Sequence, residues 1–151
     1  MRHIILLLIS LFLFAEEVKI SADKFQADEI NKIAVFEGNV TLIKGKDKIE
    51  AKKLVILFDT KNKPLKYSAE GKPKFKFFMK EKTYEGKADK IVYIPNDGKY
   101  TLLGNVFVKE LSEDRKIYGD KLIIDKSNGK ITIKGKKDKP VKFIFKVEEK
   151  K

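Results

Sequence analysis

Cysteine is absent from this 151-residue sequence, and the only histidine is His3. A chain without cysteine has no disulfide framework, no thiol nucleophile and no cysteine-based metal site. Beyond residue 3 the chain also lacks the imidazole that Ser-His-Asp and Cys-His catalysis require and that ordinary zinc sites use. Chemistry based on carboxylates or lysines stays open, but no other feature of the sequence points to it. We therefore expect a binding protein with no catalytic residue, no metal and no cofactor.

A long hydrophobic run is missing as well. The longest apolar segment, residues 4–14, has 11 residues and contains Ser10, whereas a membrane-spanning helix needs about 20. The segment follows Arg2 and ends at Ala15, as in a secretory signal peptide. We therefore expect residues 1–15 to be a signal peptide and residues 16–151 to form one mature domain in the periplasm. The alternative is that the segment is retained as a short membrane anchor.

Basic residues outnumber acidic ones, 34 to 22, for a net charge of +12. Removing residues 1–15 takes away one arginine, which leaves +11 on 136 residues. This excess favours an acidic partner such as a nucleic acid, an anionic membrane or an anionic lipid headgroup, and export argues against the first. The lysine clusters at 44–48 and 134–139 are candidates for contact with lipid phosphates. The alternative is that the lysines only keep a β-rich surface soluble and its edges unpaired.

No amphipathic helical pattern appears beyond residue 20. Short β-branched and aromatic runs alternate with turn residues, which is typical of a sandwich or barrel-like sheet. Alternation of apolar with polar residues predicts half-buried strands at residues 18–21, 74–77, 130–134 and 141–146. Asp97-Gly98 and Asn128-Gly129 predict tight hairpins, because these residue types adopt positive φ at little cost.

A glycine followed by a short strand recurs along the chain. It begins, 33 residues apart each time, at Gly38, Gly71 and Gly104, with a weaker fourth start at Gly135. Each unit reads as several short strands whose apolar face is too small to be stable alone. Stacking such units buries a continuous apolar seam, so the repeat predicts an elongated all-β body.

An Ala-Asp-Lys theme, or a close variant, lies between these starts. It places Asp23, Asp89 and Asp120 at matching positions, whereas the second unit has Lys52. A required metal ligand or acid would not be replaced by lysine. We therefore interpret the aspartates as turn or strand-edge residues that accept backbone hydrogen bonds.

Several of these motifs occur in the same order in a known family. They are Ile20-Ser21-Ala22-Asp23, Phe36-Glu37-Gly38-Asn39-Val40, Ile49-Glu50-Ala51, Gly71-Lys72-Pro73, Leu103-Gly104-Asn105-Val106 and Tyr118-Gly119-Asp120-Lys121. Through this set, roughly from residue 18 to residue 145, the chain resembles the OstA-like proteins. The resemblance implies an all-β fold, an elongated, twisted, open β-jelly roll of about sixteen short antiparallel strands. Dividing the mature domain into about sixteen strands with their turns gives each strand a length within the usual range.

The resemblance also implies a function. It predicts a carrier that moves lipopolysaccharide from the inner to the outer membrane, with the acyl chains sheltered in an apolar trough between two sheets. Such members stack end to end by strand pairing and contact inner-membrane LptC-like and outer-membrane LptD-like proteins of the same fold. We therefore expect lipopolysaccharide, other copies of the chain and these relatives as partners, and no nucleic acid. Residues 141–147 are the candidate edge strand for stacking.

An acyl chain of a dozen carbons costs on the order of 10 kcal/mol to hold in water, at about 0.8 kcal/mol per methylene, so the carrier needs an apolar lining. We predict that inward side chains of the clearest strands bind the lipid, and positional match to the family assigns Val18 and Ile20. The predicted set is Val18, Ile20, Phe36, Val40, Leu42, Phe75, Phe77, Val106, Val108, Ile131, Ile133, Phe143 and Phe145. The alternative for each residue is that it fills the core of a sandwich.

Three other interpretations stay open. The first is a membrane-anchored LptC-like relative of the same transport system, with residues 4–14 retained. The second is a basic nucleic-acid-binding β protein, since basic residues interleaved with Phe and Tyr can form a stacking groove. The third is an enzyme that uses carboxylates alone, which nothing in the sequence supports.

Overall fold

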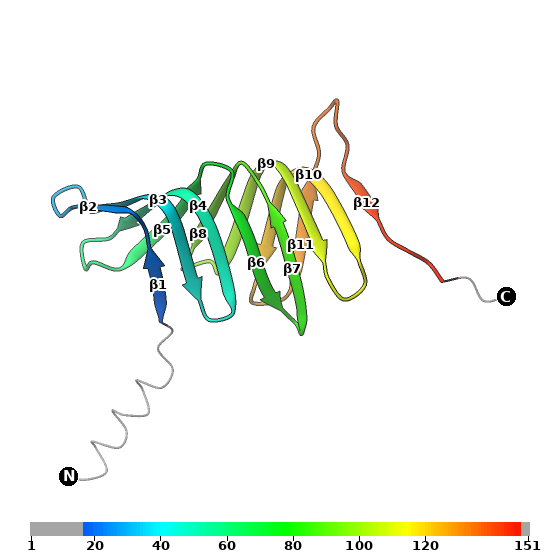
Figure 1. Ribbon diagram of the computed structural model, residues 1–151, viewed down its shortest axis with the longest axis horizontal. Coiled ribbons are helices and arrows are strands. Elements are labelled where there is room, and N and C mark those ends of the chain that lie inside the picture. The colour runs from blue at the N-terminus through cyan, green and yellow to red at the C-terminus, as the bar shows by residue number, and fades with distance from the viewer. Residues whose placement is uncertain (1–16, 149–151) are drawn as a thin grey trace, which may run out of the picture.

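The computed structural model of the protein describes residues 17–148 as an elongated body of strands, with no helix among them (Figure 1). The predicted signal peptide lies outside the described residues. Within residues 17–148, no helix is long and apolar enough to cross a membrane. The strands in chain order are β1 (Val18–Ser21), β2 (Lys24–Asp28), β3 (Ile33–Lys44), β4 (Asp47–Phe58), β5 (Pro64–Glu70), β6 (Lys74–Met79), β7 (Lys82–Lys87), β8 (Lys90–Ile94), β9 (Lys99–Glu110), β10 (Arg115–Asp125), β11 (Lys130–Lys134) and β12 (Lys142–Ile144).

The strands pair antiparallel throughout and fold into two layers. β3, β4, β9 and β10 have 11 or 12 residues each, and they bend so that one half of each lies in each layer. The first layer has the order β1-β3-β4-β6-β7-β9-β10-β12. The second has the order β2-β3-β4-β5-β8-β9-β10-β11. Because four strands serve both layers, the twelve strands supply sixteen segments, and the predicted jelly roll is confirmed.

The chain passes between the layers on one side of the body, and the two recurring themes of the sequence lie at these crossings. The Ala-Asp theme carries the chain from the first layer to the second, as at Ala22-Asp23 between β1 and β2. The glycine theme carries it back, as at Gly38-Asn39, where the register between β3 and β4 shifts. Gly38 and Asn39 both have positive φ, 80° and 46°. The 33-residue spacing is therefore the length of one full circuit through both layers.

Neighbouring crossings contact each other through side chains. Asn39 Nδ2 donates to Asp23 Oδ2 at 2.9 Å, and Asn105 Nδ2 donates to Asp89 Oδ2 at the same distance. Asp120 forms a 3.4 Å ion pair with Lys136 in the fourth unit. The expectation that backbone amides donate to these aspartates is therefore wrong. The donors are side chains of the next crossing, because each aspartate lies beside it. This role of the aspartates also explains why the second unit has a lysine instead. Lys52 lies against Gly71, and the residue after Gly71 is not an asparagine, so no side-chain amide needs an acceptor there.

The core lies between the layers along the whole body. Alternate residues of each strand point inward, as the period of two predicts. The largest fully buried side chains include Tyr100, Phe77, Leu54, Ile91, Leu102 and Leu122. The predicted strands at 18–21 and 130–134 coincide with β1 and β11, and the hairpin glycines Gly98 and Gly129 have positive φ. The strand predicted at 141–146 is shorter and spans only β12.

Candidate functional site

The middle of the predicted lipid-binding set lies deep between the layers. Six of its members are between 1 % and 6 % exposed, and they belong to the hydrophobic core: Val40, Leu42, Phe75, Phe77, Val106 and Val108. They come from the parts of β3, β6 and β9 that lie in the first layer, and their side chains point toward the second layer. In the structure these residues pack against one another, so each is a core residue whatever its role toward a lipid.

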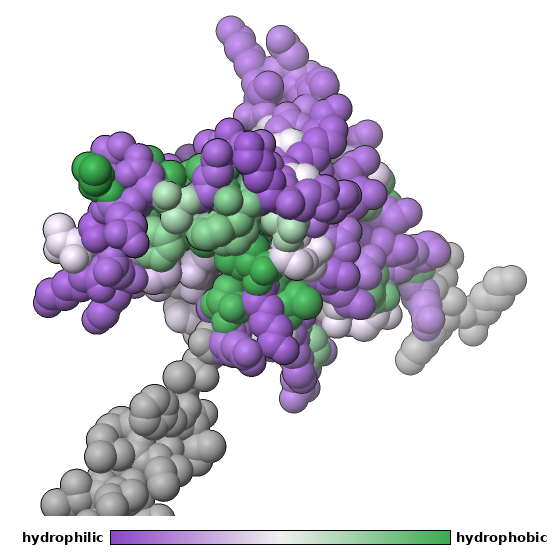
Figure 2. All heavy atoms as spheres, turned by 60° about the vertical axis from the view of Figure 1, so that its left-hand side comes forward, coloured by the Kyte–Doolittle hydropathy of each residue, from purple (hydrophilic) through white to green (hydrophobic). Residues whose placement is uncertain are grey.

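The end of the body that carries β1 and β2 exposes apolar surface (Figure 2). Val18, Ile20 and Phe36 are half-buried there and pack on the edge of the core. Phe25 of β2 is 57 % exposed, and its ring centroid lies 4.8 Å from that of Phe36. The sequence analysis missed Phe25, although a phenylalanine in the strand just after a crossing aspartate was a usable signal. Together these side chains form an apolar rim at this end of the interior.

The opposite end is also apolar. Ile131 and Ile133 of β11 are half-buried against the core. Phe143 and Phe145 are 49 % and 55 % exposed, although the pairing of Val108 with Ile117 and of Ile117 with Phe143 puts Phe143 on the inward face of its layer. The physical reason is that β12 pairs only with β10 among the described strands, and no further strand covers its side chains. Contact between these residues and a lipid stays a prediction.

A row of aromatic rings crosses the interior from one layer to the other. Phe77 of β6 lies 4.3 Å from Tyr100 of β9, and Tyr100 lies 4.5 Å from Tyr93 of β8 (centroid distances). Tyr67 of β5 continues the row at 5.8 Å from Tyr93. Burial, followed by the neighbouring Tyr93, raises the pKa of Tyr67 above its ordinary value of 10.0. These tyrosines were not among the predicted residues, and only Tyr93 lies in a run, residues 91–94, that is apolar on both faces.

Little space is left between the layers in this structure. An internal cavity of about 10 Å³ lies between β1, β3 and β4 of the first layer and β5, β8 and β9 of the second. Its lining includes Val18, Leu42, Tyr93 and Tyr100. Such a volume holds about one water molecule and no acyl chain. The interior between the layers at this point is therefore filled by side chains in this structure.

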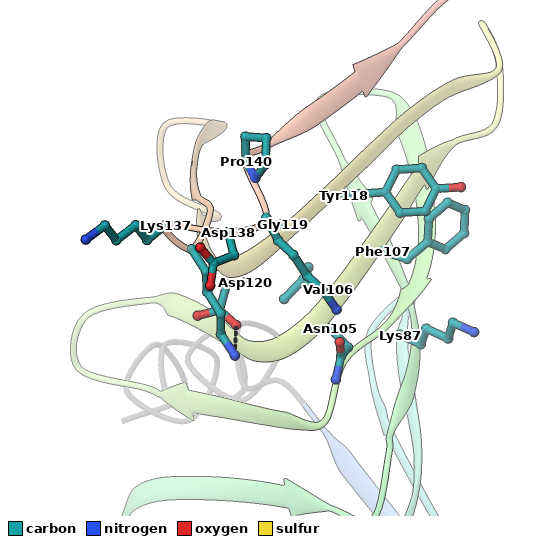
Figure 3. A pocket seen from close by; sticks show the side chains of 12 residues that line it. Lys87, Asn105, Val106, Phe107, Tyr118, Gly119, Asp120, Lys137, Asp138 and Pro140 are labelled. Atoms are coloured by element: carbon teal, nitrogen blue, oxygen red, sulfur yellow. Dashed lines mark ion pairs between the residues drawn. The ribbon is translucent and has the colours of Figure 1, made fainter.

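The two lysine clusters lie in different environments. Lys44 Nζ donates to Tyr93 Oη at 2.9 Å, and Lys46 Nζ lies 4.3 Å from the centre of the Phe78 ring. The second cluster lines a surface hollow of about 760 Å³, beside the rings of Phe107 and Tyr118, which are in contact and tilted by 42° (Figure 3). This hollow is on the outside of the sandwich. Contact of either cluster with lipid phosphates stays a prediction.

Catalytic and metal chemistry find no support in the arrangement of charged groups. Among the described residues, no group of three or more His, Cys, Asp or Glu side chains is placed to hold a metal ion. The most buried carboxylate, that of Glu110, is 4 % exposed and serves its own turn. It accepts hydrogen bonds from Ser112 Oγ and from the Glu113 amide at 2.8 Å. This carboxylate therefore stabilises the β9–β10 hairpin.

Comparison with known proteins agrees with this geometry. The model of the family described as LptA/(LptD N-terminal domain) LPS transport protein matches residues 19–130. Among solved structures, the chain is similar to LptH, the LptA homologous periplasmic component of the lipopolysaccharide transport device of Pseudomonas aeruginosa. The TM-score is 0.77 over 87 % of this chain and 96 % of that chain, and the 13 % identity makes this a likeness of fold. A search of curated proteins finds no match. The chain therefore belongs to the LptA/(LptD N-terminal domain) family of lipopolysaccharide transport proteins, which bind and transport and do not catalyse.

Proposed function

We propose that this protein is a periplasmic carrier that shelters the acyl chains of lipopolysaccharide between its two layers on the way to the outer membrane. The observation that carries the proposal is the apolar interior, which runs through the whole body and becomes accessible at both ends. Val18, Ile20 and Phe36 mark one end, and Ile131 and Ile133 mark the other. Burial of an acyl chain of a dozen carbons stabilises the complex by on the order of 10 kcal/mol, so no catalytic group is needed.

We further propose that copies stack end to end into a bridge. β1 and β2 form the edges of the two layers at one end, and β12 and β11 form them at the other. Each layer has an even number of antiparallel segments, so β12 of one copy meets β1 of the next in antiparallel order, and β11 meets β2 likewise. Main-chain hydrogen bonds can therefore continue both sheets across the junction. A head-to-tail contact of this kind does not close, and it leads to filaments that relatives of the same fold, LptC-like and LptD-like, can terminate.

Photo-crosslinking tests the carrier function directly. A photoreactive phenylalanine analogue placed at Ile20 or Phe36 should crosslink lipopolysaccharide, because both side chains face the interior. The matched control is Lys19, which neighbours Ile20 on β1 but is exposed on the outer face. Equal crosslinking at Lys19, or none at any position, would contradict the proposal.

A further inference from the structure

The two layers are tied together by charged groups on the side of the body opposite the crossings. On this side, which we call the open side, the hairpin turns 44–47 and 79–82 of the first layer meet the turns 94–99 and 125–130 of the second. Asp47 is the first residue of β4 in the first layer. Lys126 directly follows β10 in the second layer. Lys126 Nζ lies 3.0 Å from Asp47 Oδ2 and 3.1 Å from Oδ1, so the pair spans the open side.

Each partner of this pair is held by further bonds. The Phe78 amide of β6 donates to Asp47 Oδ1 at 2.9 Å, and the Tyr100 hydroxyl of β9 donates to Oδ2 at 3.4 Å. Lys126 Nζ also donates to the Phe78 carbonyl oxygen. The Asp47 side chain is 9 % exposed and that of Lys126 is 25 % exposed. The carboxylate is therefore buried while the ammonium group keeps access to solvent.

A second lysine makes a parallel link nearby. Lys44, at the end of β3 in the first layer, donates to Tyr93 Oη of β8 in the second layer at 2.9 Å. Its ammonium group also lies 4.7 Å from the centre of the Tyr93 ring. Lys44 and Tyr93 both line the small internal cavity. Two lysines therefore stand where an acyl chain has to pass in order to enter from the open side.

Entry at this point has an electrostatic cost that depends on the ligand. Separating the layers parts Asp47 from Lys126, and breaking one side of a buried ion pair is strongly unfavourable because it leaves a charge without a partner. A phosphate offers Lys126 a new anionic partner and forms a charge-assisted hydrogen bond to it. A lipid without an anionic headgroup offers nothing in exchange. The arrangement therefore distinguishes ligands by the charge next to their acyl chains.

We propose that the Asp47–Lys126 pair is a latch on the open side, which is released when a phosphate of an anionic lipid replaces Asp47 as the partner of Lys126. Lys44 is the second lysine of this phosphate site. The inference rests on the proposed carrier function and specifies how its ligand is admitted. It makes Lys126 a residue that determines specificity for phosphorylated lipids.

Binding of diphosphoryl lipid A, compared with the same lipid stripped of both phosphates, tests the latch. Lys126→Met should weaken binding of the phosphorylated lipid about tenfold, whereas the stripped lipid should bind at least as well as to the wild type, because the ion pair no longer has to be parted. Asp47→Asn should keep the preference for phosphate and increase the association rate of the phosphorylated lipid. Lys76→Met and Glu85→Gln are matched controls, because this 3.8 Å ion pair is exposed on the outer face of β6 and β7. Both controls should bind like the wild type.

A crosslink provides a second test of the latch, which does not depend on the stability of the single variants. The chain has no cysteine, so Asp47→Cys with Lys126→Cys creates two unique thiols that a short bis-maleimide can join through two thioether bonds. The joined protein should bind neither lipid, whereas the unjoined double variant should bind both lipids about as Lys126→Met does. Unchanged binding after joining, or equal loss of both lipids in Lys126→Met, would overturn the latch. Failure of the wild type to bind either lipid would overturn the carrier function itself.

Discussion

One added methyl group at Gly104 tests how the crossings are built. Gly104 has a φ of +79°, and a Cβ at this position would lie 2.4 Å from Asp89 Oδ2 and 3.0 Å from Asp89 Cβ. Gly104→Ala therefore combines two costs. The left-handed backbone costs an L-residue about 1–2 kcal/mol. Displacing Asp89 from its hydrogen bond with Asn105 costs about 1 kcal/mol, and crowding against the Asp89 Cβ adds about 1 kcal/mol or more.

The matched control is Gly98→Ala. Gly98 has a φ of +63°, and nothing lies within 4 Å of an added Cβ. This variant should lose only the backbone contribution of about 1–2 kcal/mol, against about 3–4 kcal/mol for Gly104→Ala. Urea unfolding followed by circular dichroism measures both. In an Asp89→Ala background, the cost of Gly104→Ala should fall by about 1 kcal/mol, because the carboxylate is gone, and should stay above that of Gly98→Ala, because the Cβ of residue 89 remains. Equal costs for the two glycine variants in the wild-type background would refute the reasoning.

Three further predictions concern the interior, the ends and the pH response. Ile20→Asp should abolish most lipopolysaccharide binding in a co-migration assay, whereas Lys19→Asp on the outer face should not, since only Ile20 packs against the core. Phe143→Pro should lower the mean mass in light scattering at high concentration, because proline disrupts the edge strand that continues the sheet. Burial raises the pKa of Glu110, but hydrogen bonds from Ser112 and the Glu113 amide, with nearby Lys82, together hold it below its ordinary value of 4.5. The ionised form therefore stabilises the fold above that value, and this contribution is lost as the pH falls below it; Glu110→Gln should flatten this part of the unfolding profile.

The repetitive architecture was predictable from the sequence because each crossing carries its own chemical signature. Gly38 and Gly104 satisfy a positive φ, and Asp23 and Asp89 accept from the asparagine of the neighbouring crossing. Lys52 breaks the aspartate pattern where the adjacent crossing has Lys72 in place of asparagine. Local backbone requirements of this kind are visible in one sequence without knowledge of the tertiary contacts.

The site was less predictable, because a strand's period says which side chains share a face but not what covers that face. Phe75 and Phe143 show the same alternation, yet Phe75 is 4 % exposed in a central strand and Phe143 is 49 % exposed in an edge strand. Tyr93 belongs to a run, residues 91–94, that is apolar on both faces, so the sequence pattern does not show which of its side chains point inward. The Asp47–Lys126 pair joins residues 79 positions apart. Such a contact depends on how the two layers close, which no local pattern encodes.

A filled interior is compatible with the proposed carrier function. An empty open trough would expose a long apolar surface, and such surfaces cause association. It would also bind an acyl chain with nearly the full burial energy of about 10 kcal/mol, and so release it slowly. When the layers close on each other in the absence of lipid, side chains such as Phe77 and Tyr100 cover one another, and part of the binding free energy is used to separate them. The net affinity is then lower than the gross burial energy. In the proposed bridge, transfer between two stacked copies would then be close to balanced, because the donor would close its interior as the acceptor opens.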